Sequence, residues 1–464
     1  MKKRNGSQFL VLFVLLCGGL SLMGCFETEP QEGVLDVWVT WAEDEGPLQM
    51  LFAQYSEISG APIKVTTGLS MDKVQRALSG EAVPDLVVLS GSGPVKSWYG
   101  QGLLAPLDAR IASEGIEKDD FYPAAWAQCE TSQGVTLCLP WNSDVYALYW
   151  NKELFRAAGL DPERPPRTMD ELVEMADTLT LRDGEGKLMQ VGFVPDLTRS
   201  HSELYARMLG GAWGSVEGTG LAVNSQAMVD ALNWQRQFYD RCGTEELIEF
   251  ISSVNRYANS RHPVLAGQRA SCQQCHLELP AKSHSPMHGF YTGQVAMMVA
   301  GQWPVGSNDL SRVLTDLDYG IVPFPPPAGH PERANTALVQ GAVVVIPAQA
   351  RDAEAAAGLL AWMMTPEVMA EVAHAHASLP ARRAAVVGPR FQEVPGLGVF
   401  LDLLGQPHAA GAVTMSLSPE LNAALGQVED QVLRNNGDPV SLLDGVQAEF
   451  ERELREALAL QSGP

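Results

Sequence analysis

The spacing of apolar residues divides the start of the chain into alternating strands and helices. Residues 34–40 alternate apolar and polar side chains, which is typical of a strand with one buried face. A helix is expected to begin at Gly46-Pro47, because apolar residues then recur on one helical face. These residues are Leu48, Leu51, Phe52 and Tyr55.

The same pattern repeats in the next fifty residues. Ile63 and Val65 mark a second strand, a second helix follows Ser70, and residues 85–89 form an apolar run typical of a buried strand. Strand–helix–strand units of this kind predict a parallel sheet with helices on its faces. Ligands of such sheets bind beyond the carboxyl ends of the strands.

A second α/β unit is expected from about Val145. Thr168 and Glu171 form a capping box that opens a helix, and Ser225 precedes another helix. The remaining expected elements are strands at 295–299, 319–322 and 342–346, a helix at about 350–364, and helices from about residue 419 to the end.

Composition places the chain among globular proteins that do not bind nucleic acid. Its 464 residues are 46% hydrophobic and 19% charged, and this length favours two domains of ordinary size. The formal net charge of −23 repels phosphate backbones, so nucleic acid is excluded as a partner.

The first 25 residues predict export from the cytoplasm. Lys2, Lys3 and Arg4 precede a short apolar run, and small residues follow, as in a secretory signal. The ending at residues 22–25 (LMGC) resembles a bacterial lipobox, in which Cys25 is lipidated and becomes the mature N-terminus. An ordinary cleaved signal with a chance cysteine is the alternative. Residues 26–33 would then be a tether, and no later apolar stretch is long enough to cross a bilayer.

Cys129 and Cys138 flank an expected hairpin that turns near Gln133-Gly134. Because they lie close together in the sequence of an exported protein, we predict a disulfide between them. Its short loop would stabilise the turn by roughly 2–3 kcal/mol.

Several segments, in the right order, resemble one family. The longest is residues 139–152 (LPWNSDVYALYWNK), followed by 153–155 (ELF) and Ala158-Gly159. Further segments are 165–172 (PPRTMDEL), 192–193 (GF), 210–213 (GGAW), 293–297 (GQVAM), 301–303 (GQW) and 340–341 (QG). Together they resemble the bacterial extracellular solute-binding proteins, the maltose-binding-like receptors of ABC importers.

This resemblance implies a two-lobed α/β periplasmic-binding-protein fold with a hinge and a central ligand cleft. Lobe 1 would comprise residues 34–143 and 337–378, and lobe 2 residues 144–336 and 379–464. The implied function is a non-enzymatic one. A monomer, lipid-anchored outside the cytoplasm, would capture a carbohydrate or similar polyol, close its lobes on it, and present it to the importer's membrane subunits.

The family's ligand sites lie at strand ends that face the cleft. The resemblance places the following candidate ligand-binding residues there: Trp41, Glu43, Ser90, Ser92, Asp144, Trp213, Trp303 and Arg382. Aromatic rings would stack on the C–H faces of a sugar, and polar groups would bind its hydroxyls. Core packing is the alternative for Trp213 and Trp303, and a hinge salt bridge is the alternative for Asp144. Ser90 and Ser92 replace a charged loop of the maltose binder, which argues against maltose itself.

One motif does not belong to the family pattern. Cys272-Gln-Gln-Cys275-His276 matches the haem c attachment signature, with His276 as an iron ligand and Met287 or His288 as the second axial ligand. It lies in a Cys/His-rich insertion at about 255–290. A haem-bearing redox or sensor protein built on the same fold is therefore the alternative function.

Two other interpretations of this insertion stay open. Cys272, Cys275, His284 and His288 have the residue types of a tetrahedral zinc site, although the spacer is short. Alternatively, Cys242 forms a disulfide with Cys272 or Cys275, and the histidines belong to a plain loop. A hydrolase is disfavoured, because Glu43 and Asp144 could pair but neither a nucleophile elbow nor a catalytic metal motif is present.

Overall fold

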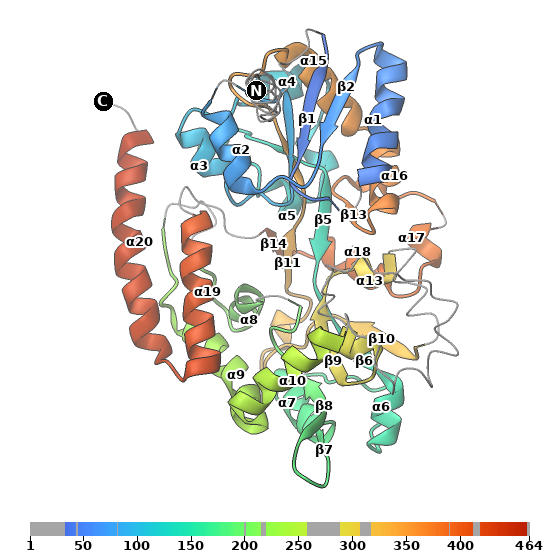
Figure 1. Cartoon of the computed structure of the whole chain (residues 1–464), viewed down its shortest axis with the longest axis vertical. Helices are drawn as coiled ribbons and strands as arrows, with labels where there is room; N and C mark the ends of the chain where they lie inside the picture. The colour runs from blue at the N-terminus through green and yellow to red at the C-terminus, as the bar shows by residue number, and fades with distance from the viewer. Residues whose placement is uncertain are drawn as a thin grey trace, which may run out of the picture.

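The computed structural model describes residues 33–42, 45–80, 82–198, 201–214, 220–257, 288–306, 317–388, 390–411 and 418–461. These residues form two α/β lobes, one above the other, with a small sheet between them (Figure 1). No helix in these ranges is both long and apolar enough to cross a membrane.

Lobe 1 is built on a five-stranded sheet of order β2-β1-β3-β12-β4. Strands β1 to β3 are parallel, as the sequence predicts, whereas β12 pairs antiparallel with both β3 and β4. The elements of this lobe are β1 (Leu35–Val39), α1 (Glu45–Ser59), β2 (Ile63–Thr66), α2 (Met71–Leu78), β3 (Leu86–Leu89), α3 (Val95–Gly100), α4 (Asp108–Ser113), η1 (Lys118–Asp120), α5 (Pro123–Trp126), β4 (Leu139–Pro140), β12 (Val343–Val345), α15 (Ala353–Met363) and α16 (Pro366–Ala375).

Lobe 2 contains a second five-stranded sheet, of order β10-β6-β9-β8-β7. Helices α19 and α20 stand beside it and contact α9 (Figure 1). The elements are β6 (Ala147–Asn151), α6 (Lys152–Ala157), α7 (Met169–Thr178), β7 (Leu181–Arg182), β8 (Leu188–Phe193), α8 (Ser202–Met208), α9 (Gln226–Cys242), α10 (Thr244–Tyr257), α12 (His288–Tyr291), β9 (Val295–Ala300), α13 (Trp303–Gly306), β10 (Tyr319–Val322), η2 (Pro331–Arg333), α19 (Ser418–Asn435) and α20 (Pro439–Gln461).

The third sheet, of order β13-β5-β11-β14, lies between the lobes. It contains β5 (Asn142–Val145), β11 (Ala337–Gln340), β13 (Leu379–Pro380) and β14 (Ala409–Gly411), with η3 (Arg383–Ala385), α17 (Arg390–Glu393) and α18 (Leu397–Leu404) nearby. The chain thus enters lobe 2 through β5 and returns through β11, and β13 pairs with β5 at a third crossing. A Cβ at Gly341, which follows β11, would lie 2.3 Å from the Asn142 carbonyl oxygen, so this close approach requires glycine.

Local sequence signals account for the helix starts. Ser70 caps α2 by accepting a hydrogen bond from the Lys73 amide at 3.3 Å, and Thr168 caps α7 by accepting one from the Glu171 amide at 3.1 Å. The Glu171 carboxylate accepts from the Arg167 amide, one residue before the cap. The capping interpretation is confirmed, with the return bond shifted by one residue.

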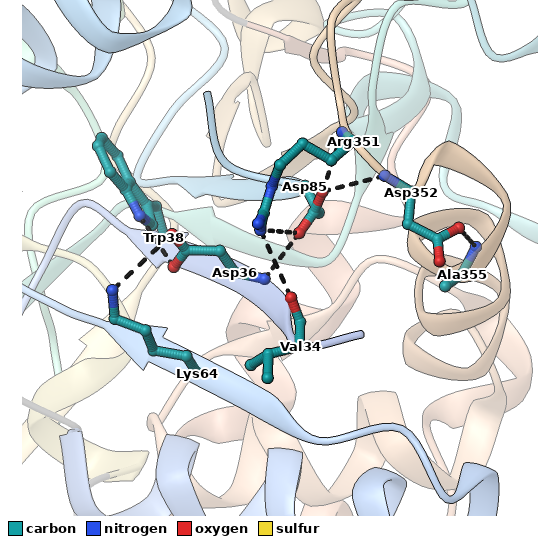
Figure 2. A network of polar contacts seen from close by, with 8 residues as sticks. All are labelled: Val34, Asp36, Trp38, Lys64, Asp85, Arg351, Asp352 and Ala355. Carbon is teal, nitrogen blue, oxygen red and sulfur yellow. Dashed lines mark hydrogen bonds and ion pairs between the residues drawn. The ribbon is translucent and has the colours of Figure 1, made fainter. Parts of the chain in front are cut away.

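A buried carboxylate ties lobe 1 together at the end of the sheet where β1 and β3 begin (Figure 2). Asp85 is 1% exposed and accepts hydrogen bonds from the amides of Asp36, Arg351 and Asp352 and from the Arg351 guanidinium. Asp352 in turn caps α15 through the Ala355 amide. This network, here called the Asp85 network, fixes the segment that returns from the hinge to β1 and to the start of β3.

Candidate functional site

A cavity of about 520 Å³ lies between the lobes. Lobe 1 contributes the loop that follows β3 together with Gln128, lobe 2 contributes residues from α8, α9, α19 and α20, and the hinge contributes the end of β11. Its lining includes Ser90, Gly91, Ser92, Gln128, His201, Ser202, Glu203, Trp213, Met228, Leu232, Leu338, Gln340, Asn422, Leu425, Val428, Glu429 and Leu443.

The lobe 1 wall stands at the carboxyl end of the parallel strands, as expected for such a sheet. The Ser90 amide donates a hydrogen bond to Thr40 Oγ1 at 2.8 Å, which fixes the loop to the end of β1. Ser92 Oγ donates to Gln128 Oε1 at 3.3 Å, and both residues are 3% exposed. This wall therefore offers hydroxyl and amide groups and no charged side chain among the described lining residues.

The lobe 2 wall carries two buried carboxylates at the start of α8 and on α19. Glu203 Oε1 accepts from Arg207 Nη2 at 2.7 Å, which balances its charge. Glu429 Oε2 accepts from Ser202 Oγ at 2.6 Å, and Ser202 Oγ accepts from Gln235 Nε2 at 2.9 Å. Both carboxylates are no more than 5% exposed, so their fields act on the cavity with little screening by water.

A second layer of polar contacts connects the cavity to the hinge. Gln340 lines the cavity, and its Oε1 accepts a hydrogen bond from the Tyr146 hydroxyl at 3.0 Å. Gln302 is fully buried and bonds two of the crossing segments, β5 and the residues before β13. Its Nε2 donates to Asp144 Oδ1 at 2.7 Å and to the Ala377 carbonyl at 3.3 Å, and its Oε1 accepts from the Val145 amide at 3.2 Å.

Three of the predicted ligand-binding residues line the cavity: Ser90, Ser92 and Trp213. The Trp213 indole nitrogen is buried and has no hydrogen-bond partner among the described residues. These three positions come from both lobes, which is the arrangement that a cleft ligand requires.

Four others are not among the residues that line it. Asp144 is engaged by Gln302 in the hinge, and the Trp41 ring meets His376 edge-on, with centroids 6.2 Å apart. The ring centroids of Trp303 and Tyr146 lie 5.8 Å apart, and the Tyr146 hydroxyl in turn bonds Gln340 of the cavity lining. Arg382 forms an ion pair with Asp120 and donates to the Met364 carbonyl at 2.7 Å, so lobe 1 contacts hold its guanidinium. Ligand binding by these four stays a prediction.

Sequence reasoning missed much of the cavity lining. Gln128, His201, Glu203 and Glu429 were not selected, because each is a single polar residue in a helix or at its edge, with no motif around it. Only Gln340 carried a signal, since Gln340-Gly341 is one of the segments that resemble the family.

Cys129 and Cys138 are two free, buried thiols in this structure. Burial, and then the contact with Cys138, raises the pKa of the Cys129 thiol. The hairpin between them is present, with Glu130 and Thr136 bridged and Gly134 in the left-handed region at φ 80°. The disulfide is therefore not formed here, although the two side chains are adjacent, and it stays a prediction for the oxidised protein.

The remaining predicted residues lie outside the described part of the chain. They are Cys25, Glu43, Cys272, Cys275, His276, His284 and Met287. His288 begins α12, and its side chain also lies outside the description. Lipidation, haem and zinc therefore stay predictions.

Comparison with known proteins identifies relatives of one kind. The family model described as "Bacterial extracellular solute-binding protein" matches residues 51–398. The sn-glycerol-3-phosphate-binding periplasmic protein UgpB of Shigella dysenteriae serotype 1 is 27% identical over 278 residues, 58% of this chain and 55% of that protein. UgpB of Escherichia coli O6:K15:H31 is 27% identical over 343 residues, 71% of this chain and 70% of that protein. The match thus spans little more than half of the Shigella relative.

Solved structures confirm the two-lobed α/β periplasmic-binding-protein fold. CpMnBP1 with mannotriose bound superposes with a TM-score of 0.74 at 23% identity, covering 90% of this chain and 99% of that chain. UgpB from Mycobacterium tuberculosis in complex with glycerophosphocholine gives a TM-score of 0.68 at 19% identity, covering 93% and 100%. At these identities the likeness shows the fold alone.

Proposed function

The chain belongs to the bacterial extracellular solute-binding proteins, and we propose that it captures a neutral carbohydrate or similar polyol between its lobes for an ABC importer. The family places the protein outside the cytoplasm and makes it a binding protein rather than an enzyme. The observation that carries the proposal is the cavity, whose polar groups come from both lobes and from the hinge.

Hydroxyl groups of a polyol match the groups that line this cavity. Ser92, Gln128 and Gln340 offer hydroxyl and amide partners, and the Trp213 ring offers an apolar face for C–H groups. A ligand that contacts both walls stabilises the closed arrangement, because half of its contacts are lost when the lobes separate.

The charge of the cavity favours a neutral ligand over a phosphate ester. Two carboxylates line it, and the described lining residues include no lysine or arginine. At a separation of about 5 Å and an effective dielectric constant of about 20, each like charge costs about 3 kcal/mol. Arg207 balances the charge of Glu203, and the described lining offers no lysine or arginine of its own to bind a phosphate. Recognition of glycerol phosphate, named for the UgpB relatives, is therefore not what we propose here.

Calorimetry with a panel of neutral mono- and oligosaccharides and sn-glycerol 3-phosphate tests this proposal. We expect at least one neutral sugar to bind, to raise the melting temperature, and to reduce the radius of gyration in small-angle X-ray scattering as the lobes close. Binding of glycerol 3-phosphate in preference to every neutral sugar, or no binding from the whole panel, would contradict it.

A matched pair of variants locates the binding site. Gln128→Ala removes a buried amide from the cavity wall, and we expect about tenfold weaker binding of the best sugar. Gln101→Ala removes an exposed amide at the end of α3, which bonds only to Ser97 among the described hydrogen bonds. Its affinity should equal that of the wild type. Equal affinities for both variants would place the sugar elsewhere.

We further propose that Cys25 carries the lipid anchor, supported by the signal-like sequence before it. Membrane fractionation and intact mass of the protein from its native envelope would test this. Cys25→Ser should release the protein from the membrane without changing sugar affinity, whereas unchanged membrane association would argue against the anchor.

The sequence Cys272-Gln-Gln-Cys275-His276 supports a second candidate, covalent haem c, with zinc or no cofactor as the rivals. An absorption spectrum and intact mass, taken after expression with haem c assembly factors, would distinguish them. A Soret band and the mass of a haem, both lost in Cys275→Ser, would support haem. A bound zinc ion or an unmodified mass would exclude it.

A further inference from the structure

The cavity has a buried end and an exposed rim. Gln128 and His201 are 3% and 2% exposed and lie at the buried end. Ser90, Asn422 and Gly426 line the same cavity and are exposed. Ser90 follows β3 of lobe 1, whereas the other two belong to α19 of lobe 2, which begins just below α2 and α3 in Figure 1. The cavity therefore opens to solvent between the loop after β3 and α19.

One face of α19 borders this opening. Asn422, Gly426 and Glu429 all line the cavity. They are four and three residues apart, so they lie on the same face of the helix. Gly426 stands between the other two on this face. A side chain at residue 426 would therefore project from α19 toward the opening.

The packing of α19 does not account for a glycine at this position. Apart from the helix backbone around it, a Cβ built on Gly426 has no described atom within 4 Å, and its φ is not in the left-handed region. The helix continues beyond it to Asn435, so Gly426 is not a helix C-cap. Glycine inside a helix lowers helix stability relative to alanine. What Gly426 provides in return is unfilled space at the cavity rim.

The lobe 1 side of the opening has the same character. Gly91 and Gly93, in the loop after β3, also line the cavity, and a Cβ at either position has no described atom within 4 Å. Neither glycine has a positive φ, so the conformation of the loop does not require them. Backbone without side chains therefore borders the opening on both sides, from lobe 1 and from lobe 2.

Resting on the proposed function, we propose that Gly426 determines specificity for the length of the bound carbohydrate. One sugar ring occupies the buried end, beside Gln128 and Gln340. The next ring lies in the opening between Gly426 and the loop of residues 91–93, where a side chain would take its place. The cavity volume of about 520 Å³, in the range of pockets that hold drug-sized ligands, agrees with a ligand of more than one ring.

Calorimetry with the one-ring and two-ring members of the sugar series that binds tests this assignment. For the wild type, we expect the second ring to strengthen binding about tenfold or more. Gly426→Leu places a side chain in the opening, and should lower the ratio of two-ring to one-ring affinity by about tenfold.

Gly445→Leu is the matched control. Gly445 lies within α20, is exposed, has no described atom within 4 Å of a Cβ apart from the helix backbone, and is not among the lining residues. This variant should keep the wild-type affinity ratio. Because leucine favours a helix over glycine, both variants should melt no lower than the wild type, so a lower ratio in Gly426→Leu would not reflect unfolding.

A variant in lobe 1 keeps the test informative if Gly426→Leu fails to fold. Gly91→Leu fills the opening from the opposite wall, and it should lower the two-ring to one-ring ratio in the same way.

The outcomes separate this inference from the proposed function. One-ring sugars that bind as tightly as two-ring sugars would overturn the role of Gly426 and leave sugar capture intact. An unchanged ratio in folded Gly426→Leu, or an equal loss in Gly445→Leu, would do the same. If Gly426→Leu does not fold, the ratio measured for Gly91→Leu decides. If no sugar of either length binds, both proposals are overturned.

Discussion

Replacing Asp85 with alanine should destabilise lobe 1 strongly, because this carboxylate joins three segments at the start of its sheet (Figure 2). Asp85 accepts from the amides of Asp36 at 2.9 Å, Arg351 at 3.0 Å and Asp352 at 3.2 Å, and from Arg351 Nη2 at 2.8 Å. Alanine offers no acceptor, so all four donors lose this partner at once.

The magnitude follows from which donors can regain water. A buried donor left without a partner costs about 1–3 kcal/mol, and removing one partner of a buried ion pair costs about 3–5 kcal/mol. The Arg351 side chain is 35% exposed and can be rehydrated, whereas the backbone amides lie beside a carboxylate that is 1% exposed. We therefore expect the free energy of unfolding to fall by about 3–5 kcal/mol.

Urea unfolding followed by tryptophan fluorescence would measure this loss. Lys64→Ala is the matched control: its ammonium lies 4.0 Å from Asp36 and its side chain is 56% exposed, so the change should stay within about 1 kcal/mol. Ligand affinity should not change in either variant. Asp85 precedes β3 and Ser90 follows it, so the four residues of the strand separate the network from the cavity by about 13 Å. A loss no larger for Asp85→Ala than for Lys64→Ala would refute the reasoning.

Three further outcomes are expected. Burial raises the pKa of Asp36, so ionisation of this carboxyl disfavours the folded state. The free energy of unfolding of Asp36→Asn, relative to that of the wild type, should therefore increase as the pH rises from below 3.8 to neutrality. Urea titrations at both pH values would measure this difference. Gln302→Leu removes the hydrogen bonds of the Gln302 side chain to Val145, Asp144 and Ala377. The free energy of unfolding should fall by about 2–3 kcal/mol. The small-angle scattering profile of the unliganded protein should also change. If Cys129 and Cys138 form a disulfide in the exported protein, dithiothreitol should add two hydrogens to its mass and lower its stability by about 2–3 kcal/mol, with no such effect in the double serine variant.

The elements of this fold were predictable because each depends on signals within a few residues. Ser70 and Thr168 start helices by accepting hydrogen bonds from amides three residues later. Residues 86–89 are an unbroken apolar run, and they form a strand whose four side chains are all buried. The antiparallel pairing of β12 with β3 was not predictable in this way. It joins residues more than 250 positions apart, and its register depends on how the chain returns from the hinge rather than on local pattern.

The site was less predictable, because a cavity is a property of facing walls rather than of motifs. Aromatic and charged residues attract attention in a sequence, yet Arg382 and Trp303 are held by neighbours outside the cavity lining, Asp120 and Tyr146 respectively. Gln128 and Glu429 line it because α5 ends, and α19 passes, on opposite sides of the same space. A side chain acquires a binding role when the fold leaves it beside unfilled volume, and that volume depends on every helix packed around it. The absence of lysine and arginine from the described lining, which favours a neutral sugar over a phosphate ester, therefore follows only from the assembled lobes.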